Sequence, residues 1–223
     1  MRSASRLAPG DAVRLLCDDG GECSGIIERF ERDTAVVAIE PAAGPRLKPL
    51  AAHPRLILAP AIIKGPRMDF LIEKAVELGA CEIRPILCAR GVVMAPGPSK
   101  LARWRRIAAA AAKQSLVPAL CQIREAVSFD QMLRGVPEGT LALICVPGAT
   151  PLGELARYAS ASSVLIVCGP EGGFEPGEHE LALAHGLQPV GLGPNRLRGE
   201  TAALAALSIV NAATGWSSGP GSR

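Results

Sequence analysis

The chain has 223 residues, of which 48% are apolar and 20% are charged. This composition is ordinary for a folded soluble protein and excludes a chain that is disordered throughout. Aromatic residues make up only 3%, which argues against recognition of single-stranded bases by stacking on aromatic side chains. The formal net charge of +3 is modest, and no uncharged apolar stretch is long enough to cross a membrane. We therefore expect no membrane partner.

Cysteine usage points to a reducing compartment. The seven cysteines are Cys17, Cys23, Cys81, Cys88, Cys121, Cys145 and Cys168. Their number is odd, none forms a C-x-x-C pair, and several lie inside apolar runs that we expect to be strands. This pattern is typical of reduced thiols that serve as small core residues. It predicts a cytoplasmic protein without a metal site.

Short apolar runs separated by turn residues make up the first part of the chain. The expected strands are residues 12–16, 25–27 and 34–39. Asp19-Gly20 is a hairpin signal, and the Pro/Gly/Ala-rich residues 41–45 predict a linker. We therefore expect a small β domain over residues 1–50 and a larger domain over residues 55–216.

From residue 55 onward, apolar runs alternate with amphipathic segments. The expected strands are residues 56–59, 83–87, 120–123, 141–146, 164–168 and 189–192. The expected helices are residues 69–78, 100–115, 129–133, 176–185 and 200–213. This alternation predicts an α/β domain with a mainly parallel sheet that is covered on both faces.

A glycine-rich loop, Gly169-Pro170-Glu171-Gly172-Gly173-Phe174, follows the apolar run at residues 164–168. Gly172 and Gly173 can adopt positive φ and lack a Cβ, so a planar ligand can approach their backbone amides. Ligands of α/β proteins bind at the carboxyl ends of strands. A plain turn between a strand and a helix would have the same sequence, so both interpretations stay open at this point.

A second loop of the same kind spans residues 192–202 and follows the last expected strand. Because the two loops end successive strands, we expect them to share one pocket. Neither G-x-G-x-x-G after the first strand nor the phosphate-loop lysine motif is present, which argues against classical dinucleotide and nucleoside triphosphate sites.

Positive charge is concentrated between Lys64 and Lys113, where ten basic residues face four acidic ones. Such a segment is a candidate surface for a polyanion. A solvated helix surface explains the cluster equally well.

Three sequence blocks carry a family resemblance. They are Lys64-Gly-Pro-Arg-Met-Asp69 with Lys74-Ala-Val-Glu-Leu-Gly79 and Pro85; Gly169-Pro-Glu-Gly-Gly-Phe174; and Leu192-Gly-Pro with Leu197-Arg-Gly-Glu-Thr-Ala202. In order and spacing they resemble the RsmE family of 16S ribosomal RNA uridine-N3 methyltransferases, of the SPOUT class. The resemblance implies a C-terminal deep trefoil knot, a small PUA-like β-barrel before it, a homodimer, and S-adenosylmethionine as the cofactor.

The resemblance also implies a target, one uridine in the decoding region of the small ribosomal subunit, and a cofactor pocket read largely by backbone groups. The residues implied to line this pocket are Ile144, Val146, Pro147, Gly148, Gly169, Pro170, Glu171, Gly172, Gly173, Leu192, Gly193, Asn195 and Leu197. The residues expected to contact the RNA backbone are Arg6, Lys64, Arg67, Arg90, Arg103, Arg105 and Arg106.

Methylation of uracil N3 requires loss of a proton and stabilisation of the resulting anion. We assign Arg198 to the anion, and Glu200 or else Glu171 to the proton. The structural alternative is that Glu200 merely favours the first turn of a helix while Arg198 pairs with Glu200 or with Glu171.

Some positions depart from the family pattern. The segment that matches the family's first strand is missing, and Gln114-Ser115 is followed by Leu116 without the usual arginine. Two alternatives therefore stay open: a SPOUT methyltransferase for another RNA position, and a non-catalytic RNA-binding or ribosome-assembly protein that retains the knot.

Overall fold

The structure is a computed structural model that describes residues 7–16, 22–32, 34–39, 54–115, 117, 120–154 and 161–214. The chain divides into two compact units, with the main boundary between Ala51 and Ala52 and with residues 118–120 grouped with the first unit. The expected turn at residues 19–20, the linker at residues 41–45 and Arg6 lie outside the described residues.

The first unit contains a three-stranded antiparallel sheet in the order β1-β2-β3. Its strands are β1 (Ala12–Leu16), β2 (Glu22–Glu31) and β3 (Thr34–Ile39). β2 is much longer than the predicted residues 25–27 because it pairs with both neighbours, and the register shifts between Ile27 and Arg29 where the strand bends. The assignment of this unit to a PUA-like barrel stays a prediction.

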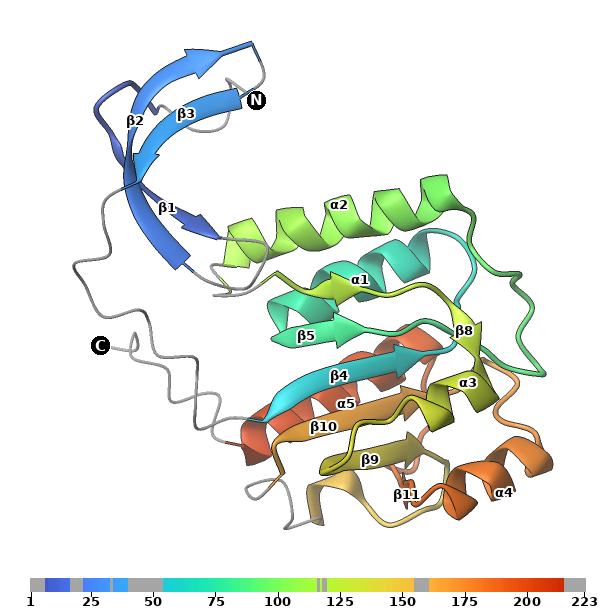
Figure 1. Ribbon diagram of the computed structural model, residues 1–223. Coiled ribbons are helices and arrows are strands. Elements are labelled where there is room, and N and C mark those ends of the chain that lie inside the picture. The colour runs from blue at the N-terminus through green and yellow to red at the C-terminus, as the bar shows by residue number, and fades with distance from the viewer. Residues whose placement is uncertain are drawn as a thin grey trace. The chain divides into compact units, whose positions relative to one another are not determined.

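The second unit is built on a six-stranded sheet in the order β11-β9-β10-β4-β5-β7. Its strands are β4 (Arg55–Pro60), β5 (Ala80–Ile83), β7 (Gln122–Ile123), β9 (Thr140–Cys145), β10 (Ser163–Cys168) and β11 (Gln188–Val190). All neighbouring strands run parallel, so the predicted α/β class with a mainly parallel sheet is confirmed (Figure 1).

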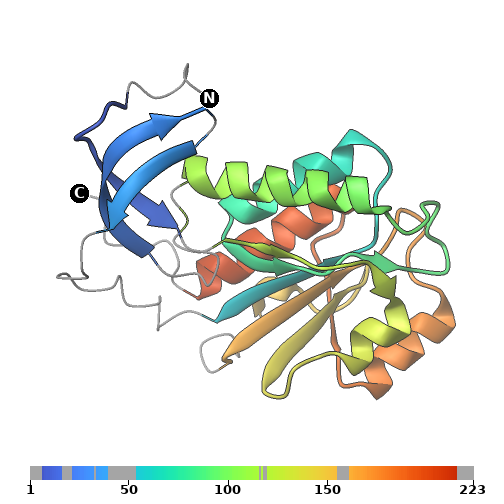
Figure 2. The same cartoon turned by 45° about the horizontal axis from the view of Figure 1, so that its top comes forward.

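Helices cover both faces of this sheet (Figures 1 and 2). They are α1 (Pro66–Glu77), α2 (Pro98–Ser115), α3 (Phe129–Arg134), α4 (Pro176–Ala184) and α5 (Gly199–Ala213), with a short 3-10 helix, η1 (Leu152–Glu154). α5 packs on β4 and β10 and also contacts α1, which in turn packs on α2. α3 and α4 lie on the opposite face and contact each other.

Alternation along the strands explains why both faces are apolar. Ile57 and Leu165 cluster with Phe129 of α3 on one face, whereas their neighbours in sequence point to the helices of the other face. Every residue of β10 is therefore buried, which is the pattern of a parallel strand covered on both sides.

The predicted strand at residues 83–87 is wrong in one respect, because it is two strands. β5 ends at Ile83, and β6 (Ile86–Leu87) pairs in a separate two-stranded sheet with β8 (Val127–Ser128), which the sequence analysis did not predict. Pro85 separates them, since proline has no N–H to donate to a neighbouring strand.

Within the part of the chain that the structure describes, no helix is long and apolar enough to cross a membrane.

Candidate active site

Three loops meet at one edge of the sheet, beyond the carboxyl ends of β9, β10 and β11. β9 pairs with both other strands in parallel, so the loops at residues 146–151, 169–175 and 191–198 leave the same edge. The loop at residues 146–151 is bound to the segment that contains the loop at residues 191–198. Val146 N–H donates to the Val190 carbonyl at 2.8 Å, and Gly191 N–H donates to the Thr150 carbonyl at 2.8 Å. The predicted proximity of the two glycine loops is confirmed by a bond from Arg196 Nη2 to the Glu171 carbonyl at 2.9 Å.

Each loop contributes one glycine whose backbone lies in the left-handed region. Gly148, Gly173 and Gly193 have φ values of 80°, 72° and 107°. A Cβ at any of the three would find no other heavy atom within 4 Å, so the space beside each backbone is open. A side chain there would strain the loop and fill that space. These three glycines leave open space at one edge of the sheet, which allows a flat ligand to contact the backbone groups there.

Two other glycines are required for packing. A Cβ at Gly169 would stand 2.9 Å from Cε2 of Phe174, whose ring packs on Phe129 with centroids 5.3 Å apart. Gly172 does not adopt the positive φ that the sequence allows. Its Cα faces Arg90 instead, since a Cβ there would lie 3.3 Å from the Arg90 Cβ.

Arg67 of α1 joins two of the predicted catalytic acids. Its Nη1 lies 2.6 Å from Glu171 Oε1 on the glycine loop and 3.8 Å from Glu200 Oε2 on α5. Arg67 was predicted to contact RNA, and its pairing with these two carboxylates was not predicted from the sequence. The alternative in which Arg198 pairs with Glu171 or Glu200 is not found.

Glu200 has a property that its sequence position does not reveal. It is only 8% exposed in the first turn of α5, and its Oε2 atom is buried without a hydrogen-bond partner among the described residues. Such an atom is expensive to bury unless something pairs with it. Arg198, at the N-cap of the same helix, is exposed and forms no salt bridge with any described residue.

Comparisons with known proteins agree with this arrangement. A model of the RNA methyltransferase domain matches residues 51–211. Ribosomal RNA small subunit methyltransferase E of Synechocystis sp. is 34% identical over 212 residues, which is 93% of this chain and 68% of that protein. The chain belongs to the ribosomal RNA small subunit methyltransferase E family. The enzyme of that name from Bacillus subtilis is 30% identical over 217 residues, 92% of this chain and 83% of that protein.

The fold of this methyltransferase E family member also matches a solved relative. A crystal structure of ribosomal RNA small subunit methyltransferase E from Neisseria gonorrhoeae, bound to S-adenosyl methionine, has a TM-score of 0.78 and 29% identity. The match covers 93% of this chain and 85% of that one. The resemblance found in the sequence motifs is thereby confirmed at the level of the family.

The predicted cofactor-lining residues of this methyltransferase E family member lie on or beside the three loops. Pro147, Gly148, Gly193 and Asn195 are exposed there. Pro170, Leu192 and Leu197 are half-buried. Ile144 differs, because its side chain is fully buried in the core beneath. Only its backbone is therefore available to a ligand.

The predicted RNA contacts lie in three kinds of environment. Arg103 Nη2 forms a salt bridge with Asp69 at 2.7 Å, and Arg105 Nε donates to the Ile123 carbonyl at 3.4 Å. Lys64 and Arg106 are exposed and have no salt bridge with any described residue. Arg90 lies at the glycine loop, where its Nη1 donates to the Gly172 carbonyl at 3.2 Å.

No role was predicted for Arg196 from the sequence. Its contact with the Glu171 carbonyl fixes one glycine loop to the other. The position of Arg196 inside the second loop was the available signal. Its partner is 25 residues away in sequence, so no local pattern points to it.

Proposed function

We propose that this chain transfers the methyl group of S-adenosylmethionine to N3 of a uridine in 16S ribosomal RNA, in the decoding region of the small subunit. The observation that carries the proposal is the buried Oε2 of Glu200, which accepts no hydrogen bond from any described residue and lies beside three loops with open glycines. Membership of a family of ribosomal RNA methyltransferases supports the coarser reaction, and the choice of base and position is our inference.

The loops suit S-adenosylmethionine because open glycines expose their backbone groups to a flat ligand. Gly148, Gly173 and Gly193 would allow the adenosyl group close to the backbone. When bound, the cofactor supplies an electrophilic methyl group on sulfur. The Neisseria gonorrhoeae relative was crystallised with this molecule, which supports the assignment.

Glu200 is our choice for the acceptor of the uracil N3 proton. Its Oε2 is already withdrawn from water and accepts no hydrogen bond from a described residue, although Arg67 lies 3.8 Å away, so it can accept a proton from a bound base. Glu171 is the weaker choice, since its carboxylate is held by Arg67 at 2.6 Å. Arg67 therefore holds the two acids together and fixes their positions.

Arg198 is our choice for stabilising the uracil anion. It ends the loop at residues 191–198, two residues before Glu200, and its guanidinium forms no salt bridge with any described carboxylate. A planar guanidinium can donate two bonds to the oxygens of a uracil anion or of a phosphate.

The knot and the homodimer belong to the same proposal. The loop at residues 146–151 lies along the segment that follows β11, since Val146 N–H donates to the Val190 carbonyl and Leu152 N–H to the Gly191 carbonyl at 2.9 Å. The knot would be formed by these two segments and the loop at residues 169–175. Ala203 and Ala206 of α5 are fully buried within the chain. A dimer contact would therefore use the half-buried remainder of this helix, Ala202, Ala205 and Ile209. We infer a cytoplasmic enzyme.

Two measurements test the function. Mass spectrometry of 16S RNA from a deletion strain should show loss of one N3-methyluridine, which the wild-type gene restores. Arg198→Ala should bind S-adenosylmethionine in calorimetry as the wild type does and transfer methyl at least about tenfold more slowly, as expected when about 1.4 kcal/mol of transition-state stabilisation is lost.

The control is Arg134→Ala, an exposed arginine on α3 that pairs with Asp130 at 2.8 Å and lies away from the loops. It should retain full activity. Full activity of Arg198→Ala would refute its role. A wild-type protein that binds RNA but neither binds the cofactor nor methylates would support the non-catalytic alternative, and a methylated base elsewhere would support the alternative RNA position.

A further inference from the structure

We infer that a second surface, far from the glycine loops in sequence, binds the phosphate backbone of RNA through Arg55, Arg84 and Arg124. We call these three residues the arginine face. The inference rests on the proposed RNA substrate and adds a binding surface that the family motifs do not contain.

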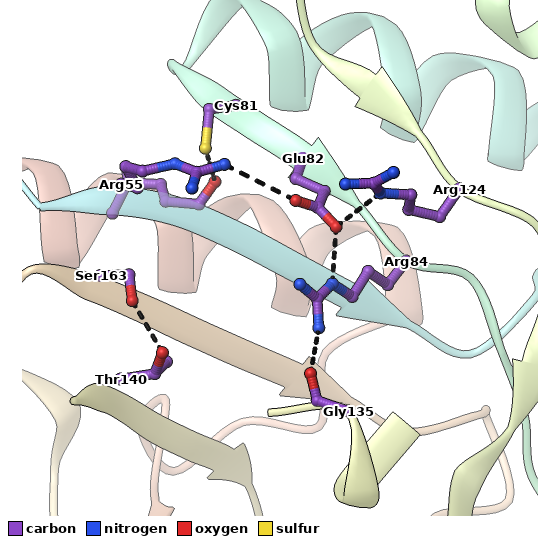
Figure 3. Close-up of polar contacts among 9 residues, drawn as sticks. Arg55, Cys81, Glu82, Arg84, Arg124, Gly135, Thr140 and Ser163 are labelled. Carbon is purple, nitrogen blue, oxygen red and sulfur yellow. Dashed lines mark hydrogen bonds and ion pairs between the residues drawn. The ribbon is translucent and has the colours of Figure 1, made fainter. Parts of the chain in front are cut away.

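The three arginines surround one buried carboxylate, Glu82 of β5, which is 2% exposed (Figure 3). Arg84 Nε lies 2.7 Å from Glu82 Oε1, and Arg124 Nε lies 2.9 Å from the same oxygen. Arg55 Nη2 lies 3.7 Å from the other oxygen, Oε2. The carboxylate therefore orients the three guanidiniums, but its single negative charge does not neutralise their three positive charges.

The sheet register places these residues on one face. Glu82 pairs with Ile57 of β4 and with Gln122 of β7. Side chains two residues apart on a strand point the same way, so Arg55 and Arg124 lie beside Glu82. Ile57 belongs to the face that α3 covers, and Arg84 Nη1 donates to the carbonyl of Gly135, at the end of α3, at 2.9 Å.

Two of the three side chains of the arginine face are exposed to solvent. The side chains of Arg55 and Arg124 are 64% and 55% exposed, while that of Arg84 is 18% exposed. Arg84 uses both Nε and Nη1 for these bonds, whereas Arg124 contacts the carboxylate through Nε and Arg55 through Nη2. The exposed N–H groups are therefore mainly those of Arg55 and Arg124. Three positive charges against one negative charge leave a net charge of +2 that no described residue pairs.

Such a surface favours a chain of phosphates over other partners. Guanidiniums that are already oriented lose little entropy when they bind an oxyanion, and they bind phosphate with two bonds. The low aromatic content leaves backbone contact, rather than base stacking, as the available mode. Positive charge continues around the edge strand, where Arg105 of α2 donates to the carbonyl of Ile123.

One RNA can reach this face and the candidate active site together. Arg84 precedes Arg90 by six residues, and Arg90 donates to the Gly172 carbonyl of the glycine loop. Six residues span at most about 20 Å even when fully extended. The distance between the two arginines is therefore no more than about the length of six nucleotides in one strand of a B-form duplex.

The test is the salt dependence of RNA binding. Arg55→Gln/Arg124→Gln should reduce the slope of log affinity against log salt by about 1.5, because each lost phosphate contact contributes about 0.7 to 0.9. Near 0.1 M salt this corresponds to about 30-fold weaker binding of a 16S RNA transcript. Arg55→Lys/Arg124→Lys should restore most of the slope, since it keeps both charges.

Arg134→Gln is the matched control. It removes an arginine that is 72% exposed on α3 and is already neutralised by Asp130, so the slope should stay at the wild-type value. Glu82→Gln is the second variant, because it weakens the support of the face and keeps all three charges. It should lower the melting temperature without lowering the slope.

An unchanged slope in the double glutamine variant, with the fold intact by circular dichroism, overturns the inference. The inference is also overturned if the double glutamine variant binds an acidic peptide more weakly than the wild type does while its RNA binding is unchanged. The partner of the arginine face is then a protein. Failure of the proposed function looks different: the wild-type protein would bind RNA with the expected slope and leave the uridine unmethylated.

Discussion

Replacement of Gly169 by alanine tests whether the close packing of the loop at residues 169–175 is needed for stability and for cofactor binding. The new Cβ would stand 2.9 Å from Cε2 and 3.1 Å from Cδ2 and Cζ of Phe174. The ring cannot retreat freely, because it packs on Phe129 with the centroids 5.3 Å apart. Overpacking of this kind costs about 1–3 kcal/mol. For a domain of this size that lowers the melting temperature by about 2–12 °C.

The same replacement should weaken cofactor binding, because displacement of Phe174 moves the loop that carries Gly173. Calorimetry with S-adenosylmethionine and thermal unfolding measure the two effects on one sample. Gly177→Ala is the control, since a Cβ there meets no heavy atom within 4 Å and the residue lies in α4. It should be neutral or stabilise by up to about 1 kcal/mol.

A double-mutant cycle with Phe174→Leu isolates the clash. Leucine is smaller, so Gly169→Ala should cost about 1 kcal/mol less in the Phe174→Leu background than in the wild type, which is a coupling well above the error of such cycles. Costs that add within about 0.5 kcal/mol would refute the view that the Phe174 ring is what requires glycine at this position.

Two further predictions concern ionisable groups. Burial raises the pKa of Glu82, but hydrogen bonds from Arg124 and Arg84 lower it more, to a value below the ordinary 4.5. The stability that Glu82 contributes relative to Glu82→Gln should therefore be constant above about pH 4.5 and shrink as the pH falls below it, measured by urea unfolding; a difference that grows on acidification would contradict this sign. Burial, with a smaller effect of Glu178, raises the pKa of the Cys88 thiol to about 12. Cys88 should therefore resist iodoacetamide at pH 8 in the folded protein and react once it is unfolded, and mass spectrometry that finds it alkylated in the native state would refute the burial argument.

The elements of the sheet domain were predictable because their signals are local. Apolar runs gave the strands at residues 56–59, 141–146 and 164–168 within one or two residues at each end. The two glycine loops were predicted to lie together from their places after successive strands, and the bond from Arg196 to Glu171 shows that they do. Position along a parallel sheet is thus enough to predict that two such loops lie together.

Contacts between side chains were not predictable in the same way. Arg67 was grouped with RNA-binding residues because of its charge, and its partners, Glu171 and Glu200, are more than 100 residues away in sequence. The lack of a hydrogen bond to Glu200 Oε2 among the described residues likewise depends on what surrounds the first turn of α5. No pattern in a single sequence contains that information.

The arginines show that the density of charge along a sequence does not reveal which cations are paired in the folded chain. Between residues 64 and 113, Arg67 and Arg103 are engaged by carboxylates of the same unit, because a helix that carries many cations also attracts acids from its neighbours. Arg55 and Arg124 stand 69 positions apart in sequence and belong to no run. The register of β4, β5 and β7 brings them to the same carboxylate, where cations exceed anions. For a parallel sheet, a polyanion surface should therefore be sought in residues that share a face and lack enough counter-charges, since that excess is what a phosphate chain can neutralise.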